Sequence, residues 1–187
     1  MKLQFKHQKF QADAAKAVVD VFAGQPYLTP SYMMDRGSGN YQVGINEEKD
    51  FTGWSNGKIV PELSDGVILE HLQRIQRNNQ IEPSRTLEGK FNLTIEMETG
   101  VGKTYTYIKT MYELNKQYGW SKYIIVVPSI AIREGVYKSF EITQEHFAEE
   151  YGKKIRFFIY NSSQLTEIDR FASDSSINVM IINSQAF

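Results

Sequence analysis

Residues 98–104 read Glu-Thr-Gly-Val-Gly-Lys-Thr and lie between two segments with different periodicities. Before them, apolar residues alternate with polar ones at Phe91, Leu93, Ile95 and Met97, which predicts a strand that runs into the loop. After them, apolar residues recur at helical spacing as far as a glycine that suits a helix end: Tyr107, Ile108, Met111, Leu114 and Tyr118, then Gly119. A strand, a glycine loop and a helix in this order predict a site that surrounds phosphate.

The residue types of this loop suit a polyphosphate. Gly100 and Gly102 permit backbone conformations that other residues disfavour, so that successive amides can turn toward one anion. The following helix directs its unpaired N–H groups and the positive end of its dipole to the same point. Lys103 can neutralise the outer phosphates, and the Thr104 hydroxyl can bind a bridging magnesium ion. An ordinary glycine turn is the alternative, which the flanking strand and helix patterns disfavour. The candidate site, with Lys103 as its catalytic residue, is Thr99, Gly100, Val101, Gly102, Lys103 and Thr104.

One position departs from the full Walker pattern. That pattern has a glycine five residues before the second loop glycine, and here the position is Met97. Kinases and GTPases of the P-loop class commonly keep that glycine. The shorter form Thr-Gly-x-Gly-Lys-Thr resembles motif I of superfamily 2 helicases and translocases, so the loop favours a nucleic-acid motor.

The composition indicates one globular domain. The chain has 187 residues, of which 41% are hydrophobic, and this length suffices for one buried core. No apolar run approaches the roughly 18 residues that span a bilayer, and the N-terminus has no signal-peptide core, so we expect a cytoplasmic location. The absence of cysteine excludes disulfides and thiolate zinc sites. The net charge of -1 gives no overall attraction to DNA or RNA, so a nucleic-acid partner must be recognised through local sites.

Before the loop, the patterns predict two helices separated by an irregular insertion. The first helix has an apolar face and ends near Gly24 and Pro26; the face carries Phe10, Ala14, Ala17, Val18, Val21 and Phe22. Residues 26–58 show little periodicity, which predicts an insertion that could include a hairpin. Ser64 suits the N-cap of a second helix with Ile68, Leu72 and Ile75 turned inward.

After the loop helix, strands alternate with helices. A continuous apolar run at 123–127 is typical of a strand covered on both faces, and it ends at Pro128. A helix-like stretch from Ser129 and a further piece at 143–151 follow, then a strand at 155–160, a short helix around Ile168 and a last strand at 177–182. This order predicts an α/β fold with a doubly wound, mainly parallel sheet, an irregular insertion before the loop strand, and ligands at the carboxyl ends of the strands.

Several strings together resemble the Res subunit of type III restriction enzymes, a helicase-like family of superfamily 2, over nearly the whole chain. They are residues 10–14 (FQADA), 17–22 (AVVDVF), 77–79 (RNN), 96–105 (EMETGVGKTY) and 124–135 (IIVVPSIAIREG), and the last of these resembles motif Ia. Motif I alone indicates only the superfamily, whereas the extended strings indicate the family. The resemblance implies a RecA-like motor domain of P-loop type that binds ATP and Mg²⁺.

The resemblance also implies an adenine site. Gln11 matches the glutamine of the Q motif, with Phe10 beside the base, and a carboxamide can both donate to and accept from the edge of adenine. From the residues alone, a polar position on the outer side of the first helix is the preferred interpretation of Gln11. Gln8 is the second candidate for this role.

DNA contacts are implied at two strand ends. Pro128, Ser129 and Arg133 suit the DNA backbone, or equally a capped helix start with an ordinary surface arginine. Asn183 and Ser184 are weaker candidates after the last strand. The three histidines, His7, His71 and His146, lie far apart in sequence, which favours structural roles over metal binding.

A motor of this kind also needs an acidic motif, a strand that ends in Asp followed by Glu. We find none, since the last apolar run ends at Asn183. We therefore expect residues 1–187 to be an N-terminal fragment of the first RecA-like motor domain, truncated before that motif. Its parts would be a Q-motif-like helix at 1–24, the insertion at 25–90 and the P-loop α/β core at 91–187.

The expected parent protein is the ATP-dependent, DNA-translocating and DNA-cleaving subunit of a type III restriction system, a site-specific deoxyribonuclease. It would act on double-stranded DNA together with a modification (methyltransferase) subunit, and away from membranes. One alternative is another superfamily 2 DNA or RNA helicase without nuclease activity. For the chain alone, the alternative is a nucleotide-binding module without turnover.

Overall fold

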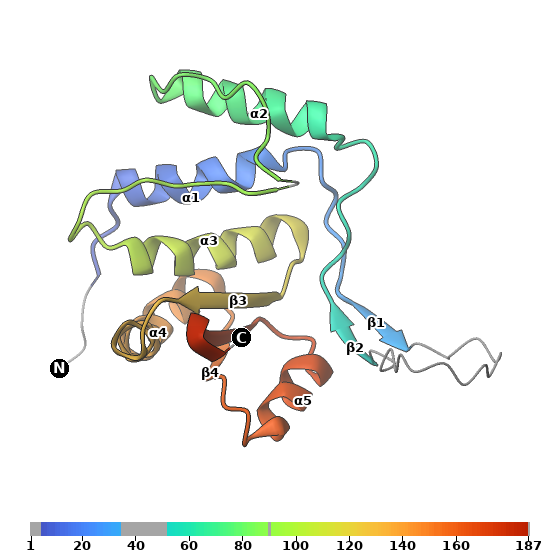
Figure 1. Cartoon of the computed structure of the whole chain (residues 1–187), viewed down its shortest axis with the longest axis vertical. Helices are drawn as coiled ribbons and strands as arrows, with labels where there is room; N and C mark the ends of the chain where they lie inside the picture. Colours follow the sequence, from blue (N-terminus) through green and yellow to red (C-terminus); the bar gives the residue numbers. More distant parts are fainter. Residues whose placement is uncertain (1–4, 35–51, 90, 187) are drawn as a thin grey trace.

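The computed structural model describes residues 5–34, 52–89 and 91–186 of the chain. Figure 1 shows α2, α1 and α3 stacked in that order, with the main sheet on the far side of α3. In chain order the elements are α1 (Lys9–Val21), β1 (Ser31–Met34), β2 (Thr52–Ser55), α2 (Asp65–Asn78), α3 (Lys103–Tyr118), β3 (Lys122–Val127), α4 (Ile130–Tyr151), β4 (Arg156–Ile159), α5 (Leu165–Ser173), β5 (Asn178–Asn183) and the 3-10 turn η1 (Ser184–Ala186).

Three parallel strands form the main sheet, in the order β3-β5-β4. Val127 at the end of β3 is opposite Asn183 at the end of β5, so the carboxyl ends of these strands lie at one edge. On the other side of β5, Phe157 of β4 is opposite Val179. The predicted α/β class with a mainly parallel sheet is therefore confirmed.

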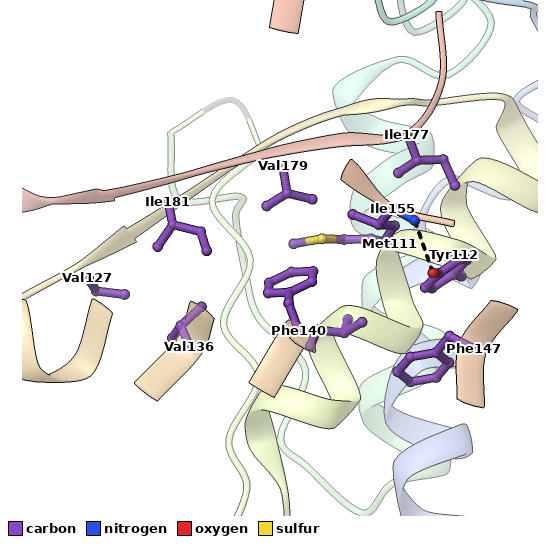
Figure 2. Close-up of a cluster of buried hydrophobic side chains, with 11 residues drawn as sticks. Met111, Tyr112, Val127, Val136, Phe140, Phe147, Ile155, Ile177, Val179 and Ile181 are labelled. Carbon is purple, nitrogen blue, oxygen red and sulfur yellow. Dashed lines mark hydrogen bonds between the residues drawn. The ribbon is translucent and has the colours of Figure 1, made fainter. Parts of the chain in front are cut away.

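The larger core lies between this sheet and the helices α3 and α4 (Figure 2). Val179 and Ile181 of β5 are fully buried there, together with Phe140 and Phe147 of α4. Burying each such side chain stabilises the fold by about 1.5–3 kcal/mol. From α3, the hydroxyl of Tyr112 accepts a hydrogen bond from the N–H of Ile155 at 3.3 Å. This cluster fixes α3, and with it the loop that precedes α3, against the sheet.

A second core lies on the other side of α3. Phe22 after α1 and Ile68 of α2 pack there with Leu114 and Tyr118 of α3. Both helices before the loop form as predicted, and the Ser64 hydroxyl accepts a hydrogen bond from the N–H of Val67 at 3.5 Å at the start of α2. Within the described residues, no helix has the length and apolar character needed to cross a membrane.

The buried face of α1 differs from the predicted one in its first half. Ala15 is fully buried and Gln11 is 8% exposed, whereas Phe10 is 46% exposed. The helix α1 packs mainly against α3. Val21 and Phe22 of the predicted apolar stripe are buried in the second core, as predicted. The earlier part of the stripe lines an open groove between α1, α2 and the segment before the loop: Phe10, Ala14, Ala17 and Val18.

The predicted strand at 91–97 is wrong. In the described part of the chain, this segment makes a single bridge, between Glu88 and Asn92, and residues 93–98 have no strand structure. Phe91 and Leu93 pack against the second core, while Ile95 is 45% exposed. The alternating pattern therefore belongs to an extended segment that packs one side of its first residues on the second core without pairing as a strand. A strand also needs a neighbouring edge for its backbone hydrogen bonds, and no described strand lies beside this one.

Two predictions about the second half need correction. Ile124 and Val126 are 55% and 53% exposed, so β3 is covered on one face only. On the opposite face, α5 meets the sheet at β4, where the rings of Phe158 and Phe171 are 6.1 Å apart. The two helical pieces predicted after Ser129 form one helix, α4, without a break.

Part of the predicted insertion is attached to the domain. β1 and β2 pair antiparallel, which agrees with the possible hairpin, and residues 35–51 lie outside the described residues. The side-chain oxygen Oδ1 of Asn56 accepts hydrogen bonds from the backbone N–H groups of Ser121 and Lys122 at 2.7 and 2.9 Å. The side-chain nitrogen Nδ2 of Asn56 donates a hydrogen bond to the Lys122 backbone carbonyl at 2.9 Å. These bonds hold the segment after β2 to the start of β3.

Candidate phosphate-binding site

The loop before α3 has the backbone that was predicted for phosphate binding. Gly100 and Gly102 have φ angles of +82° and +85°, in the left-handed region that favours glycine. The helix begins at Lys103, and its first hydrogen bond runs from the Thr106 N–H to the Gly102 carbonyl at 3.0 Å. The amides of residues 103–105 precede that bond, so they are the unpaired donors of a helix start. The structure thus places the glycine turn and the positive end of α3 at one point.

Gln11 supports this loop directly. Its side-chain amide donates a hydrogen bond to the carbonyl of Val101 at 2.8 Å across 90 positions of sequence. A Cβ at Gly102 would lie 2.6 Å from the same nitrogen, so the Gln11 side chain would have to move away. Gln11 is thus buried beside the loop, which corrects the interpretation from the residues alone that it lies on the outer side of the first helix. Its second side-chain N–H and its side-chain carbonyl oxygen have no other hydrogen bond among the described residues.

An apolar groove of about 900 Å³ opens beside the loop. Phe10 and Val18 of α1, Ile75 of α2, and Met97 and Val101 around the loop line it. Phe10 lines this groove, whereas the next residue of α1, Gln11, contacts the loop at Val101.

Lys103 and Thr104 occupy the first two positions of α3. The Lys103 side chain is exposed, and among the described residues it forms no ion pair. Thr104 is partly buried. A free ammonium group and a hydroxyl at a helix start, next to two left-handed glycines, fit the phosphates of a nucleotide and its magnesium ion.

Four of the predicted DNA-contact residues lie at the carboxyl ends of β3 and β5, and the fifth, Arg133, lies in the first turn of α4. Because these strands are paired at their last residues, Pro128 and Ser129 lie beside Asn183 and Ser184. Figure 1 shows that α3 begins at the end of the molecule where β3 finishes, so this edge and the phosphate loop are on the same side.

Not all of these side chains are equally accessible. The Ser129 hydroxyl accepts a hydrogen bond from the N–H of Ile132 at 3.3 Å, as an N-cap does. Arg133 forms an ion pair with Glu134 at 2.9 Å, and Asn183 is 8% exposed. Pro128 and Ser184 are exposed.

A family model described as type III restriction enzyme, res subunit, matches residues 62–187. The chain belongs to this family. It is 36% identical over 106 residues to the Res subunit of the type III restriction-modification enzyme EcoP15I of Escherichia coli, which covers 54% of the chain and 11% of that relative. It is 31% identical over 160 residues to the EcoPI Res subunit of Escherichia phage P1, which covers 84% of the chain and 14% of that relative.

The third relative is the StyLTI Res subunit of Salmonella typhimurium, with 42% identity over 66 residues, 34% of the chain and 7% of that protein. The chain thus spans a small part of the length of the Res subunits that it matches. Membership of the family implies a RecA-like fold and ATP binding, which agrees with the loop geometry. The resemblance inferred from the motif strings is confirmed, and a helicase outside the restriction enzymes is not favoured.

The sequence missed one cluster of chemically active side chains. The fold brings His7 and His146 together with Glu150, although 139 positions separate the two histidines. His71 lies apart, with its Nδ1 atom 3.0 Å from the carbonyl of Val21. Burial lowers the pKa of His146, while Glu150 acts in the opposite direction. The spacing of His146 and Glu150, four positions apart on one helix, was the available signal.

Proposed function

We propose that this chain is the ATP-binding part of the DNA-translocating and DNA-cleaving subunit of a type III restriction endonuclease. In the full-length protein, ATP hydrolysis would drive movement on double-stranded DNA. A separate modification (methyltransferase) subunit would be its partner, and the complex would act in the cytoplasm. Since the relatives are much longer than the chain, we further propose that residues 1–187 belong to the first motor domain of such a protein.

One observation carries this proposal. Two left-handed glycines, an exposed lysine and a threonine hydroxyl converge at the start of a helix whose other end is fixed in the core. This arrangement directs amide N–H groups, a helix dipole and one ammonium group at a single anion. Membership of the Res family supports ATP as the source of that anion.

Each residue of the loop would have a separate role. The amides of residues 100–104 would hold the phosphate oxygens, and Lys103 would balance charge on the outer phosphates. Thr104 would hold Mg²⁺ through its hydroxyl. When bound, ATP with Mg²⁺ supplies the phosphoanhydride bond whose hydrolysis releases energy. Lys103 would stabilise the negative charge that develops on the phosphate oxygens in the transition state of hydrolysis. Its removal would therefore lower mainly the rate of ATP hydrolysis.

Adenine would be recognised by Gln11 with Phe10 beside it. The Gln11 side chain keeps one N–H donor and one acceptor beyond its bond to Val101, which is the pair of groups that the adenine edge requires. Because the same side chain holds the Val101 carbonyl, base recognition and loop shape would be linked. A glutamine at this position would therefore serve both the loop and the base, which an exposed polar residue on the outer side of α1 would not.

For the chain alone, binding without turnover remains the second candidate function. The sequence shows no strand ending in Asp-Glu that could position water and hold Mg²⁺. The residues present would then bind ATP, while hydrolysis would need groups from further domains of the full-length protein.

The proposal is tested by the variant Lys103→Ala in the full-length Res subunit that carries this segment. We expect DNA-dependent ATP hydrolysis, measured as phosphate release, to fall by about 100-fold or more, and DNA cleavage to fall with it. Lys116→Ala is the matched control, because Lys116 is an exposed lysine in the last turn of the same helix. Cleavage at the rate of the unmodified enzyme in the Lys103 variant would refute the proposal.

A separate binding experiment tests the proposed DNA contacts near the carboxyl ends of β3 and β5. We propose that Arg133 exchanges its partner Glu134 for a DNA phosphate, so Arg133→Ala should weaken duplex binding, read by fluorescence anisotropy. Arg170→Ala is its control, since Arg170 is also paired with a glutamate on a helix surface, at 2.8 Å. Equal binding by the two variants would assign Arg133 to the helix surface alone.

A further inference from the structure

A cluster of three possible metal ligands lies outside the phosphate loop. The ligand atoms of His7, His146 and Glu150 are all within 4.8 Å of one another. His146 Nε2 is 3.8 Å from Glu150 Oε2. Two ligands of a tetrahedral zinc ion, each about 2.0–2.1 Å from the metal, are about 3.4 Å apart. Small side-chain rotations would therefore bring the three groups to coordination distance.

The fold supplies these ligands from two segments. His146 and Glu150 are four positions apart on α4, so they lie on one face of that helix. His7 comes from the segment before α1, and its ring centroid is 5.5 Å from that of His146. Two positions earlier, Phe5 packs against His146 and Tyr105, with ring centroids 5.1 and 5.9 Å apart. Aromatic packing thus holds the third ligand over the other two.

Charged groups of both signs surround the cluster. Lys109 opposes a bound cation, because it forms an ion pair with Glu150 Oε1 at 2.5 Å. That pair leaves Oε2 as the atom that faces His146. Lys109 also donates to the Tyr151 hydroxyl at 2.9 Å, and this hydroxyl donates to Glu113 at 2.6 Å. The Tyr151 hydroxyl thus links Lys109 to Glu113, while the ion pair of Lys109 is with Glu150.

Tyr105 is the competing partner within the site. Its hydroxyl lies 2.8 Å from His146 Nε2, so a metal ion bound at Nε2 would displace this hydrogen bond. The bond also holds the imidazole ring in place before a metal arrives. Tyr105 is two positions after Lys103, whereas none of the three ligands belongs to the loop at 99–104.

We propose that His7, His146 and Glu150 form a binding site for a divalent transition metal ion of the zinc type. Imidazole nitrogens and a carboxylate oxygen are the ligands that Zn²⁺ accepts, and three protein ligands leave a fourth position for water. The ion fastens the segment before α1 to α4. Because Gln11 follows His7 by four residues, the ion also limits motion of the helix end that carries Gln11. The site does not depend on the nucleotide function.

The test is a titration of the metal-free, untagged chain with Zn²⁺ in competition with a chromophoric chelator. We expect one Zn²⁺ per chain, and at least tenfold weaker binding in His7→Ala, which removes an exposed ligand without opening the core. His71→Ala is the control, because this histidine is on α2 and bonded to the Val21 carbonyl, and it should bind Zn²⁺ as the unmodified chain does.

A second readout separates loss of the site from loss of the fold. Amide hydrogen exchange in residues 5–12 should slow when Zn²⁺ is added to the unmodified chain and stay unchanged in His7→Ala, while circular dichroism shows both chains folded. Zn²⁺ binding in His7→Ala that is as tight as in the unmodified chain would overturn the proposal. So would the absence of one-to-one binding in the unmodified chain.

Discussion

At the scale of single residues, Gly102 and Gln11 determine the conformation of the loop. Gly102 combines a φ of +85° with a position where Cβ would approach Gln11 Nε2 to 2.6 Å. The positive φ favours glycine at position 102, and a Cβ there would in addition displace the Gln11 side-chain amide. At Gly100, with a φ of +82° and open space around it, only the positive φ favours glycine.

We predict that Gly102→Ala destabilises the chain, because alanine at a positive φ costs about 1–2 kcal/mol and displaces the Gln11 side chain from Val101. Urea unfolding followed by circular dichroism measures this change. Gly135→Ala is the matched control in α4, where a Cβ meets nothing within 4 Å and alanine should add about 0.5–1 kcal/mol. A Gly102 variant as stable as the unmodified chain would show that the loop relaxes without strain.

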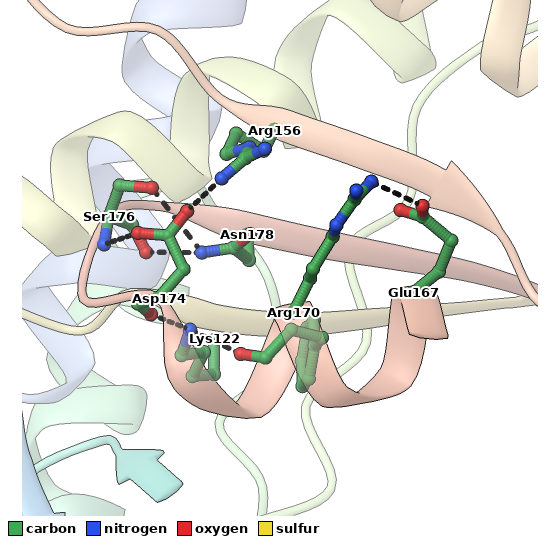
Figure 3. A network of polar contacts seen from close by, with 8 residues as sticks. Lys122, Arg156, Glu167, Arg170, Asp174, Ser176 and Asn178 are labelled. Atoms are coloured by element: carbon green, nitrogen blue, oxygen red, sulfur yellow. Dashed lines mark hydrogen bonds and ion pairs between the residues drawn. The ribbon is translucent and has the colours of Figure 1, made fainter. Parts of the chain in front are cut away.

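At the scale of elements, polar contacts tie the amino ends of the strands to α5 (Figure 3). Asp174, just after α5, forms an ion pair with Arg156 of β4 at 2.6 Å and accepts a hydrogen bond from the Ser176 N–H at 2.9 Å. Lys122 of β3 donates to the carbonyls of Phe171 and Asp174. This network lies at the strand ends opposite the phosphate loop, so its contribution is to stability.

Asp174 gives the network a dependence on pH. Burial acts to raise the pKa of this carboxyl, but the hydrogen bonds from Ser176 and the Arg156 guanidinium outweigh it and lower the pKa from 3.8 to about 2. Because this pKa is lower in the folded chain than in the unfolded chain, the ionised carboxylate stabilises the folded chain above about pH 4. That stabilisation is lost as the pH falls toward 2 and the carboxylate is protonated.

We therefore predict that Asp174→Asn lowers the free energy of unfolding at pH 7 by about 1 kcal/mol, a value reduced by solvent around the exposed Arg156. The difference between the variant and the unmodified chain should shrink from pH 4 to pH 2 in urea unfolding. Glu167→Gln, which breaks the exposed pair with Arg170, should have little effect. A difference that stays constant with pH would contradict an electrostatic origin.

The elements show what sequence patterns can predict. Caps and periodicity gave α2 from Ser64, the end of α3 at Gly119 and the three strands of the main sheet. The failures at Ile95 and Val126 have a common cause. An alternating pattern or an apolar run indicates which side chains are favourable to bury. It does not indicate which other segment pairs with that stretch or covers it, because this depends on the tertiary structure.

At the scale of the whole molecule, α3 joins the parts. One side of it packs on the sheet through Ile108 and Tyr112, and the other packs on α1 and α2 through Leu114 and Tyr118. The motif strings predicted the phosphate loop and the family, because the glycine spacing is local in sequence. The contact of Gln11 with Val101 and the approach of His7 to His146 could not be predicted from spacing, since they arise only when helices from distant segments pack together.

The most direct measurement is a titration of the ¹⁵N-labelled chain with ATP and Mg²⁺, followed through backbone amide resonances. We predict that the amides of residues 99–104 shift most, together with the side-chain amide of Gln11, and that these shifts vanish in Lys103→Ala. If those amides stay unchanged while nucleotide is added, or if the Lys103 variant gives the same shifts, the loop does not hold the phosphates of ATP.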